Sequence, residues 1–345
     1  MACSVLVTLA VFMSSCKQDL TVQPTPSVSP TSNDKIVDLN IPGVEVKDNV
    51  LYFKDGQSFK NAQEVLNSTN LVSYKAFCDK IGFKSQLILL NEAIQSLEKV
   101  KTVNEFEDFK KANSDIFTYE KGYIDLKMES QLMQKFVGKS GTMYINNDVY
   151  FYDEKGYIFV KGGDSERLSR AKISRESSEQ EGIMVGTNVI QVQTRAACAV
   201  EQNSGWVNGG SNRRGILYVN VEFIGPIYAG NNAYNVSFYS VHRGRAQKKS
   251  IFGWNDYSTD HTIIFNDVSK GLEIINNTSQ IVTQPHNGAV SLSNTNIIEW
   301  TGFICIWNNV DYNTAISASN QRFPFISIND SYSNQGGVSI NLSCQ

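Results

Sequence analysis

The stretch from Asn296 to Trp307, NIIEWTGFICIW, carries the clearest strand pattern of the chain. At a period of two residues its even-numbered positions are apolar from Ile298 to Ile306, while Glu299 begins the odd-numbered face. A β-branched and aromatic run without a helical period predicts a central strand, with one face in a core and half of the other covered. Because such a strand needs neighbours at both edges and a layer on each face, we expect a sandwich or closed sheet around it.

Similar strand patterns, separated by turn residues, follow one another through the C-terminal part of the chain. The expected strands cover residues 183–193, 217–223, 234–239, 250–254, 262–265, 272–275, 280–283, 289–292, 296–307, 323–328 and 338–344. Many short strands with no helical pattern between them are typical of an antiparallel β-sandwich.

The N-terminal part has the period of amphipathic helices, after a short strand at residues 50–53. The expected helices cover residues 59–66, 71–81, 86–99, 102–112 and 125–137. The helix after Ser85 is the clearest, because leucine and isoleucine recur there at helical spacing. Thr102 and Glu105 have the spacing of a capping box, which predicts that a helix begins there.

The two patterns meet near the middle of the chain. Three short strands at 143–145, 149–152 and 157–160 predict a meander. The charged, Gly- and Ser-bearing stretch that follows has almost no large apolar residue, so we interpret it as a linker. The predicted fold class is therefore α+β: a helical N-terminal domain ending in a β-meander, then an antiparallel β-sandwich. The expected domains are 36–161, a linker at 162–182, and 183–345.

The first residues have the pattern of a secretory signal. Residues 4–13, SVLVTLAVFM, are apolar over the length of a signal h-region and are too short to span a bilayer. Ser14 and Ser15 precede Cys16, an arrangement that resembles the lipobox of bacterial lipoproteins. Residues 1–3 lack Lys and Arg, so we expect the natural start to lie further upstream. Residues 17–35 are rich in Ser, Thr and Pro and predict an extended tether.

Composition agrees with an exported protein. The net charge of the 345 residues is −3, which gives no reason to expect nucleic acid as a partner. Charged residues make up 19% of the chain, below the roughly 25% of average globular proteins. Asn, Ser, Thr and Tyr take their place and predict a polar, weakly charged surface.

Three segments resemble a group of Bacteroidetes surface lipoproteins that have no assigned function. These segments are LYFKDGQSFKNA from Leu51, the GFKS step at 82–85, and GTMYINNDVYFYDEKGYIFVKGGD at 141–164. The resemblance covers roughly the first half of the chain, and a β-rich part follows it in that group. The resemblance implies an exported outer-membrane lipoprotein that is exposed at the cell surface, and it brings no catalytic residue with it.

The cysteines favour a disulfide over a metal site. Cys198 and Cys344 each share a strand face with apolar residues at the two ends of the expected β domain, so we predict a bond between them in an oxidising compartment. A Cys198–Cys305 bond is the competing pairing, and buried free thiols are the third alternative. The absence of a C-x-x-C motif and the separation of the histidines argue against zinc. We expect no metal and no cofactor.

Motifs for catalysis are weak. Gly138–Lys139–Ser140 matches the end of a phosphate loop, but Met133 stands where that motif needs glycine, and a hairpin follows it. The chain has no G-x-S-x-G motif, and we expect its histidines, His242, His261 and His286, to be exposed or hydrogen-bonded near loops and strand ends.

Carboxylates in the expected strands are the other catalytic candidates. Glu222, Glu273 and Glu299 lie there, and glycoside hydrolysis requires two converging carboxylates. Solvated or ion-paired carboxylates are the simpler interpretation, so we name no catalytic residue and favour a protein that is not an enzyme.

Aromatic and basic residues give the best indication of function. Trp206 and Trp254 are each followed within two residues by Asn or Asp, which places a stacking face beside a hydrogen-bonding group. The basic residues near them in the sequence are Arg243, Arg245, Lys248 and Lys249. We therefore expect a surface binding or adhesion module for polysaccharide or another envelope component. A polysaccharide hydrolase and a purely structural envelope protein are the alternatives.

Overall fold

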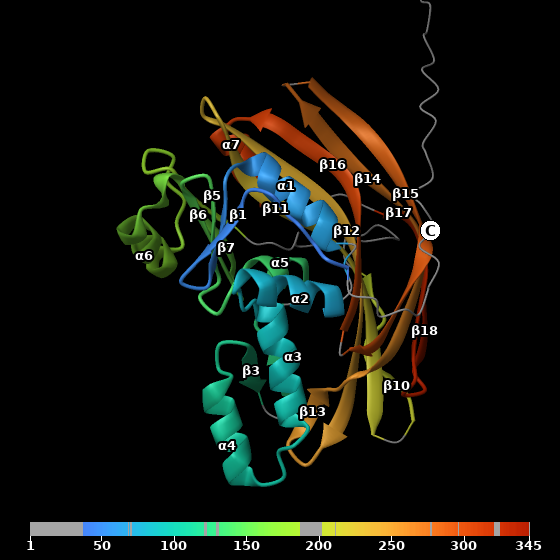
Figure 1. The fold of residues 1–345 in the computed structure, drawn as a ribbon. Helices are drawn as coiled ribbons and strands as arrows, with labels where there is room; N and C mark the ends of the chain where they lie inside the picture. The colour runs from blue at the N-terminus through green and yellow to red at the C-terminus, as the bar shows by residue number, and fades with distance from the viewer. Residues whose placement is uncertain are drawn as a thin grey trace, which may run out of the picture.

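The fold is mixed α/β, with a small helical part, a smaller sheet and a large, curved sheet (Figure 1). It comes from a computed structural model that describes residues 37–344. Within that span the description leaves out residues 68, 70, 121–122, 129–130, 187–201, 211, 277, 296 and 321–324. The signal, the tether and Cys16 therefore lie outside the described residues, as does Cys198.

The first four helices form where the sequence pattern predicts them. The helices are α1 (Gly56–Asn67), α2 (Leu71–Ile81), α3 (Gln86–Leu97), α4 (Val103–Ala112), α5 (Gln131–Phe136), α6 (Ser165–Ser174) and α7 (Tyr312–Ile316), with 3₁₀ turns η1 (Lys161–Gly163) and η2 (Ser317–Asn320). The Ser85 hydroxyl accepts a hydrogen bond from the Ile88 amide at the start of α3. Thr102 and Glu105 form the predicted capping box at the start of α4, so these local signals are confirmed.

The expected helix at 125–137 is only partly correct. Its first residues belong to strand β4 (Tyr123–Leu126), which pairs with β3 (Phe117–Glu120), and helix α5 begins only at Gln131. The pairing with β3 satisfies the backbone of these residues across strands, which overrides their helical spacing.

The smaller sheet has the order β1-β2-β5-β6-β7-β8. Its strands are β1 (Val44–Lys47), β2 (Val50–Phe53), β5 (Thr142–Ile145), β6 (Asp148–Asp153), β7 (Gly156–Val160) and β8 (Ile183–Gly186). The predicted meander is present as β5, β6 and β7. Residues 162–182, which we expected to be a linker, instead contain α6, whose first amides are capped by Asp164. Strand β8 then pairs with β7 and so belongs to this sheet.

The large sheet consists mainly of strands much longer than the sequence pattern predicts. Its strands are β9 (Gln202–Asn203), β10 (Val207–Asn208), β11 (Arg213–Gly230), β12 (Ala233–Ser250), β13 (Gly253–Asp256), β14 (Thr259–Ile275), β15 (Thr278–Thr295), β16 (Ile297–Val310), β17 (Phe325–Asn334) and β18 (Ser339–Cys344), together with β3 and β4. They form one hydrogen-bonded, partly barrel-like sheet. The expected two-sheet sandwich is therefore not confirmed.

Two predicted strands often correspond to one observed strand. Residues 262–265 and 272–275 both belong to β14, because the apparent turn between them is paired on both sides. Asp267 and Ser269, whose residue types are common in turns, are fully buried in the interior of the large sheet. Their polar side chains have partners there, so they do not end the strand.

Strand β16 is central, as its sequence predicts. It pairs with β12 along one edge and with the end of β14 along the other. Phe238 of β12 lies opposite Cys305, but the next residue of β12 lies opposite Phe303, so β16 contains a bulge. The bulge changes which positions face the core: Cys305 and Trp307 are buried beyond it, whereas Phe303 is 47% exposed.

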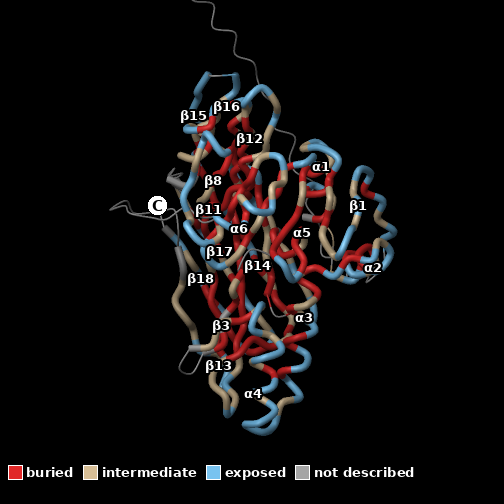
Figure 2. Tube along the Cα trace, turned by 90° about the vertical axis from the view of Figure 1, so that its left-hand side faces the viewer, coloured by how far each residue is buried: buried red, intermediate tan, exposed pale blue. Residues whose placement is uncertain are grey.

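One apolar core joins the two sheets. The ring of Tyr157 in β7 meets that of Phe223 in β11 edge-on at 5.6 Å, and Phe159 meets Tyr234 in the same way at 5.8 Å. Buried residues run through the strands and the inner sides of the helices, while α4 is mostly exposed (Figure 2). The smaller sheet and the large sheet therefore pack against each other and contribute to the same hydrophobic cluster.

Candidate functional site

Two tryptophans and an arginine form a stack at the end of the large sheet where β10 and β13 lie (Figure 1). The guanidinium carbon of Arg214 lies 4.1 Å from the centre of the Trp206 ring and 4.3 Å from that of Trp254. Arg214 belongs to β11, Trp206 precedes β10, and Trp254 lies in β13. Arg214 is 7% exposed, whereas both tryptophans are half-buried, so parts of the two indoles are accessible to solvent.

A buried hydrogen-bond network fixes the arginine of this stack. Arg214 donates from Nε and Nη2 to Oε1 of Gln247, at 3.0 and 2.5 Å. Gln247 donates to Asp256, which also accepts a 2.8 Å charge-assisted hydrogen bond from Arg245. Because its donors are held by buried partners, Arg214 is a rigid platform for both indoles, which cation–π attraction keeps in place.

The structure brings together some of the residues selected from the sequence. Trp206 and Trp254 meet on Arg214, and Arg245 lies behind them, buried and paired with Asp256. Lys249 is exposed and lies opposite Trp254 in the β12–β13 register.

The remaining basic residues of the selected group have other partners. Lys248 pairs with Glu98 of the helical part at 3.2 Å and lies near the Tyr257 ring. Arg243 is separate from the stack and is also buried. Arg243 and Arg245 therefore do not form the accessible basic surface that we expected, because strand pairing places their side chains among carboxylates.

The sequence reading missed Arg214 as the centre of this site. Arg214 stands forty residues before Trp254 in the sequence, and that separation gives no sign of contact between the two. The register of β11 on β12, with Arg214 opposite Gln247, provides that contact. Only a correct pairing of the two strands would have revealed it.

Arg243 joins two of the carboxylates considered for hydrolysis. Its Nη2 donates to Glu222 at 2.8 Å and to Glu299 at 2.6 Å, while Nε donates to Glu299 at 2.8 Å. All three side chains are at least nine-tenths buried. Glu222 and Glu299 do converge, but on an arginine rather than on an accessible cleft. Glu273, the third candidate, instead accepts a hydrogen bond from Gln280 at an exposed position.

A second buried polar cluster occupies the interior of the large sheet. His242 of β12 lies between two carboxylates: Nδ1 is 2.6 Å from Asp330, and Nε2 is 3.5 Å from Asp267. Ser240 lies 2.8 Å from Nε2 and donates to Asp267 at 3.3 Å. Nearby, His286 of β15 is hydrogen-bonded to Ser269 at 3.1 Å. The arrangement of Ser240, His242 and Asp330 thus has the distances of a Ser-His-Asp triad.

Comparison with known protein families identifies the chain. The family model described as a domain of unknown function, DUF4848, matches residues 43–271. The chain belongs to the DUF4848 family. A crystal structure of a DUF4848 family protein from Bacteroides thetaiotaomicron VPI-5482 is also similar, at 16% identity and a TM-score of 0.30, covering 87% of this chain and all of that one. No curated protein matches the chain.

Burial and neighbouring charges determine the protonation state of His242 in this DUF4848 protein. Burial by itself lowers the pKa of His242, but hydrogen bonds to Asp267 and Asp330, and their charges, outweigh it and raise the pKa to about 9. At neutral pH the ring is therefore a cation, which donates from both nitrogens and cannot accept a proton from Ser240. Ser240 and His242 are fully inaccessible, so the cluster is a buried ionic network.

All three histidines are hydrogen-bonded, which is one of the two alternatives expected from the sequence, but they are buried within strands rather than placed near loops. Burial lowers the pKa of His261 to about 4, and it also lowers that of His286. His261 lies 2.8 Å from the Tyr332 hydroxyl and 2.9 Å from the Thr295 carbonyl, which suits a neutral ring with its proton on Nε2. Polar partners on neighbouring strands make these buried positions possible.

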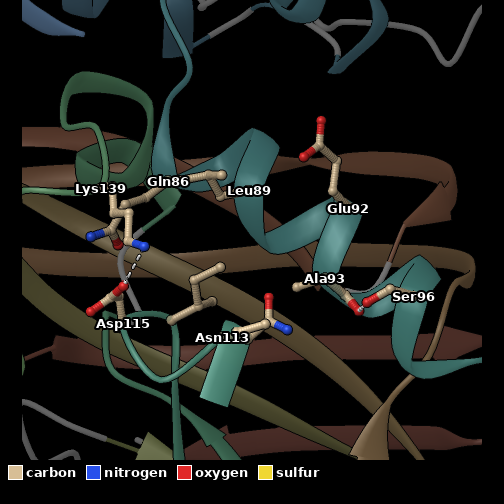
Figure 3. A pocket seen from close by; sticks show the side chains of 10 residues that line it. Gln86, Leu89, Glu92, Ala93, Ser96, Asn113, Asp115 and Lys139 are labelled. Atoms are coloured by element: carbon tan, nitrogen blue, oxygen red, sulfur yellow. Dashed lines mark hydrogen bonds and ion pairs between the residues drawn. The ribbon is translucent and has the colours of Figure 1, made fainter. Parts of the chain in front are cut away.

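A surface hollow of about 250 Å³ lies between α3 and the segment that links α4 to β3 (Figure 3). Its lining includes Glu92 and Asn113, and across it Lys139 pairs with Asp115 at 2.9 Å. Lys139 belongs to the sequence that resembled a phosphate loop, but β5 follows it rather than a helix, as we expected. Within the described residues, no group of three or more His, Cys, Asp or Glu side chains could hold a metal ion.

Two cysteines of the described residues are free thiols. Cys78 and Cys305 are buried free thiols, and burial raises the pKa of each to about 12. Cys305 donates to the Leu272 carbonyl at 3.5 Å, so the structure does not contain the competing Cys198–Cys305 bond. Cys344 ends β18, opposite Ile328, but Cys198 lies outside the described residues. The Cys198–Cys344 bond stays a prediction.

Proposed function

We propose that this DUF4848 protein is a lipid-anchored envelope protein whose large sheet binds polysaccharide at the Trp206–Arg214–Trp254 stack. The observation that carries the proposal is the pair of half-buried indoles held on one buried arginine. Two aromatic side chains fixed by a rigid element cost little conformational entropy on binding. Flat aromatic surfaces of this kind stack well on the apolar faces of sugar rings.

The neighbouring charges suggest which polysaccharides would bind. Lys249 is exposed opposite Trp254, while Arg214 is buried against both indoles and Arg245 is paired with Asp256. The stack therefore offers aromatic surface with the exposed cation of Lys249 opposite Trp254 in the register. This combination suits a neutral or weakly anionic chain better than a densely charged one, whose many anionic groups would need more cations.

The arrangement favours binding over hydrolysis. Glycoside hydrolysis requires two carboxyl groups on either side of an accessible bond. Glu222 and Glu299 are instead buried on Arg243, and the Ser240–His242–Asp330 cluster is closed to solvent. A binding role needs no such groups, so it fits these residues without further assumptions.

The membrane anchor rests on the sequence alone. The apolar run at residues 4–13 and the Ser-Ser-Cys step support acylation of Cys16, which would place the protein in the outer membrane with the large sheet on the cell surface. No helix among the described residues is long and apolar enough to cross a bilayer. Cys16→Ala should move the protein from the membrane fraction to the soluble fraction, or leave an unprocessed precursor. An unchanged distribution and an unmodified mature N-terminus would reject the anchor.

Glycan-array binding by the full chain tests the polysaccharide proposal. Trp206→Ala and Trp254→Ala should each weaken binding up to roughly tenfold, because a stacking contact contributes about 0.5–1.5 kcal/mol. Phe303→Ala is the matched control, since Phe303 is an exposed aromatic residue on β16, away from the stack. Its affinity should equal that of the unmodified chain.

Two results would count against this function. If no glycan binds, or if binding survives both tryptophan changes, the stack is not a sugar site. If either change lowers the melting temperature by several degrees, that indole belongs mainly to the core. A structural envelope role would then describe the protein better.

A further inference from the structure

Strand β15 forms a long free edge of the large sheet. It pairs with β14 from Thr278 to Thr295, and none of the described strands pairs with its other edge. In Figure 1 it lies along the outer rim of the curved sheet. Its 18 residues contrast with the other edge strands, because β1, β3 and β8 have four residues each and β18 has six.

This edge lacks most devices that keep strand edges apart. Its sequence, TSQIVTQPHNGAVSLSNT, contains no Asp, Glu, Lys or Arg. Exposed edges in monomeric proteins usually carry charges, prolines or bulges, or are short, so that other strands do not add to them. Here the single proline is Pro285, and the one register shift lies beyond Leu292, near the end of the strand. Residues 286–292 are regular, uncharged and free of proline.

The side chains of this edge alternate between the interior and solvent. His286, Val290 and Leu292 point inward and are buried or half-buried, whereas odd-numbered residues from Ser279 to Ser293 are exposed. Pro285 has no amide hydrogen, so an edge strand accommodates it with its nitrogen directed away from the neighbouring strand. The amides of the other odd-numbered residues share that direction, and they offer a row of donors and acceptors along the free edge.

We propose that β15 is a self-association edge, on which a second copy of this chain adds its own β15 in antiparallel orientation. An antiparallel pair of identical strands is related by a two-fold axis, which makes the surface self-complementary. The absence of charge removes the like-charge repulsion that two identical edges would otherwise have. Main-chain hydrogen bonds supply the attraction, as in other cases of strand addition.

The properties of β15 favour a second copy over a charged partner. No side chain of this strand offers an ion pair to an acidic or basic peptide. At about 3.4 Å per residue the strand is roughly 60 Å long, enough for two identical strands to overlap over many residues. Exposed Ile281, on the outer face of the strand, would add apolar contact.

A matched pair of variants tests this edge. The edge variant changes Asn287, Ala289 and Ser291 to Lys, and the control changes their register partners on β14, Asn266, Ile264 and Thr262, to Lys. Both variants add three charges to the same face of the sheet, but only the first adds them to the free strand. Molar mass is measured by light scattering after size exclusion, on the full chain in a mild detergent.

The unmodified chain and the β14 control should have the mass of two copies, and the edge variant that of one copy. Ala289→Pro, which removes one outward amide, gives the same outcome if the edge variant does not fold. A single-copy mass for the unmodified chain would overturn the proposal. A dimeric edge variant, or a control that dissociates equally, would also overturn it, because the edge would then not be the contact.

Discussion

The imidazole of His242 and the carboxylate of Asp330 form a 2.6 Å contact between Nδ1 and Oδ2, and neither side chain is accessible to solvent. The two residues come from β12 and β17, which are not neighbours in the sheet order. Asp267 of β14 approaches the same ring from its other nitrogen. The ion cluster therefore links three strands across the interior of the large sheet.

Breaking this cluster should cost much of the stability of the protein. Asp330→Ala removes one carboxylate and leaves a buried cation with a weaker set of partners, which typically costs about 3–5 kcal/mol. Urea unfolding measures the difference. Lys80→Ala is the control, because the Lys80–Asp38 pair is exposed and should contribute about 0–1 kcal/mol. Equal effects of the two changes would contradict a structural role for the cluster.

Stability should also depend on pH through His242. The folded pKa of about 9 lies above the ordinary value of 6.5, so the charged ring stabilises the fold. This contribution is fully present below pH 6.5 and is lost as pH rises through about 9; by linkage it is of the order of 3 kcal/mol. The free energy of unfolding of the unmodified chain should therefore decrease more between pH 6.5 and 9.5 than that of His242→Gln. Identical slopes would show that the ring is neutral in the folded protein.

Gly302 should tolerate no side chain. A Cβ atom there would lie 2.6 Å from Nδ1 of His286 and would also collide with the Trp300 ring. Gly302→Ala should thus destabilise the protein by about 1–3 kcal/mol, through overpacking of the interior. Gly210→Ala is the matched control, since its Cβ would meet only the Gly336 carbonyl, at 3.4 Å. Thermal melts of both variants check the difference, and a neutral Gly302→Ala would show that the ring of His286 can move.

The predicted Cys198–Cys344 bond can be detected by peptide mapping without reduction. A linked peptide pair should appear, and Cys344→Ser should destabilise the oxidised protein by about 2–5 kcal/mol. Cys305→Ser is the control, because that thiol is free. Free thiols at both 198 and 344 would exclude the bond.

The local features of the fold were predictable from the sequence. Helices α3 and α4 form where apolar spacing and capping residues indicate them, because those signals act within a few residues. The meander of β5, β6 and β7 follows from its turn residues for the same reason. The length of β14 could not be predicted in this way. Asp267 and Ser269 are residue types common in turns, and only the structure shows that they are buried within the strand.

The candidate site was predictable only in its aromatic members. Trp206 and Trp254 stand out by residue type and by the polar residues that follow them. Arg243 and Arg245 resemble an accessible basic run, but alternation in β12 places them against carboxylates of other strands. Arg214 joins the site through the register of β11 on β12. Long-range pairing of this kind leaves no local pattern in a single sequence.

The shared core has a consequence for how the chain matures. Tyr157 and Phe159 finish their packing only against Phe223 and Tyr234, which follow them by more than sixty residues. Synthesis proceeds from the N-terminus, so the smaller sheet emerges before the strands that cover it. The apolar side of the smaller sheet therefore stays uncovered until β11 and β12 have been synthesised. Folding of the first half is thus coupled to completion of the second, and factors that hold the emerging chain unfolded would be needed longest at this stage.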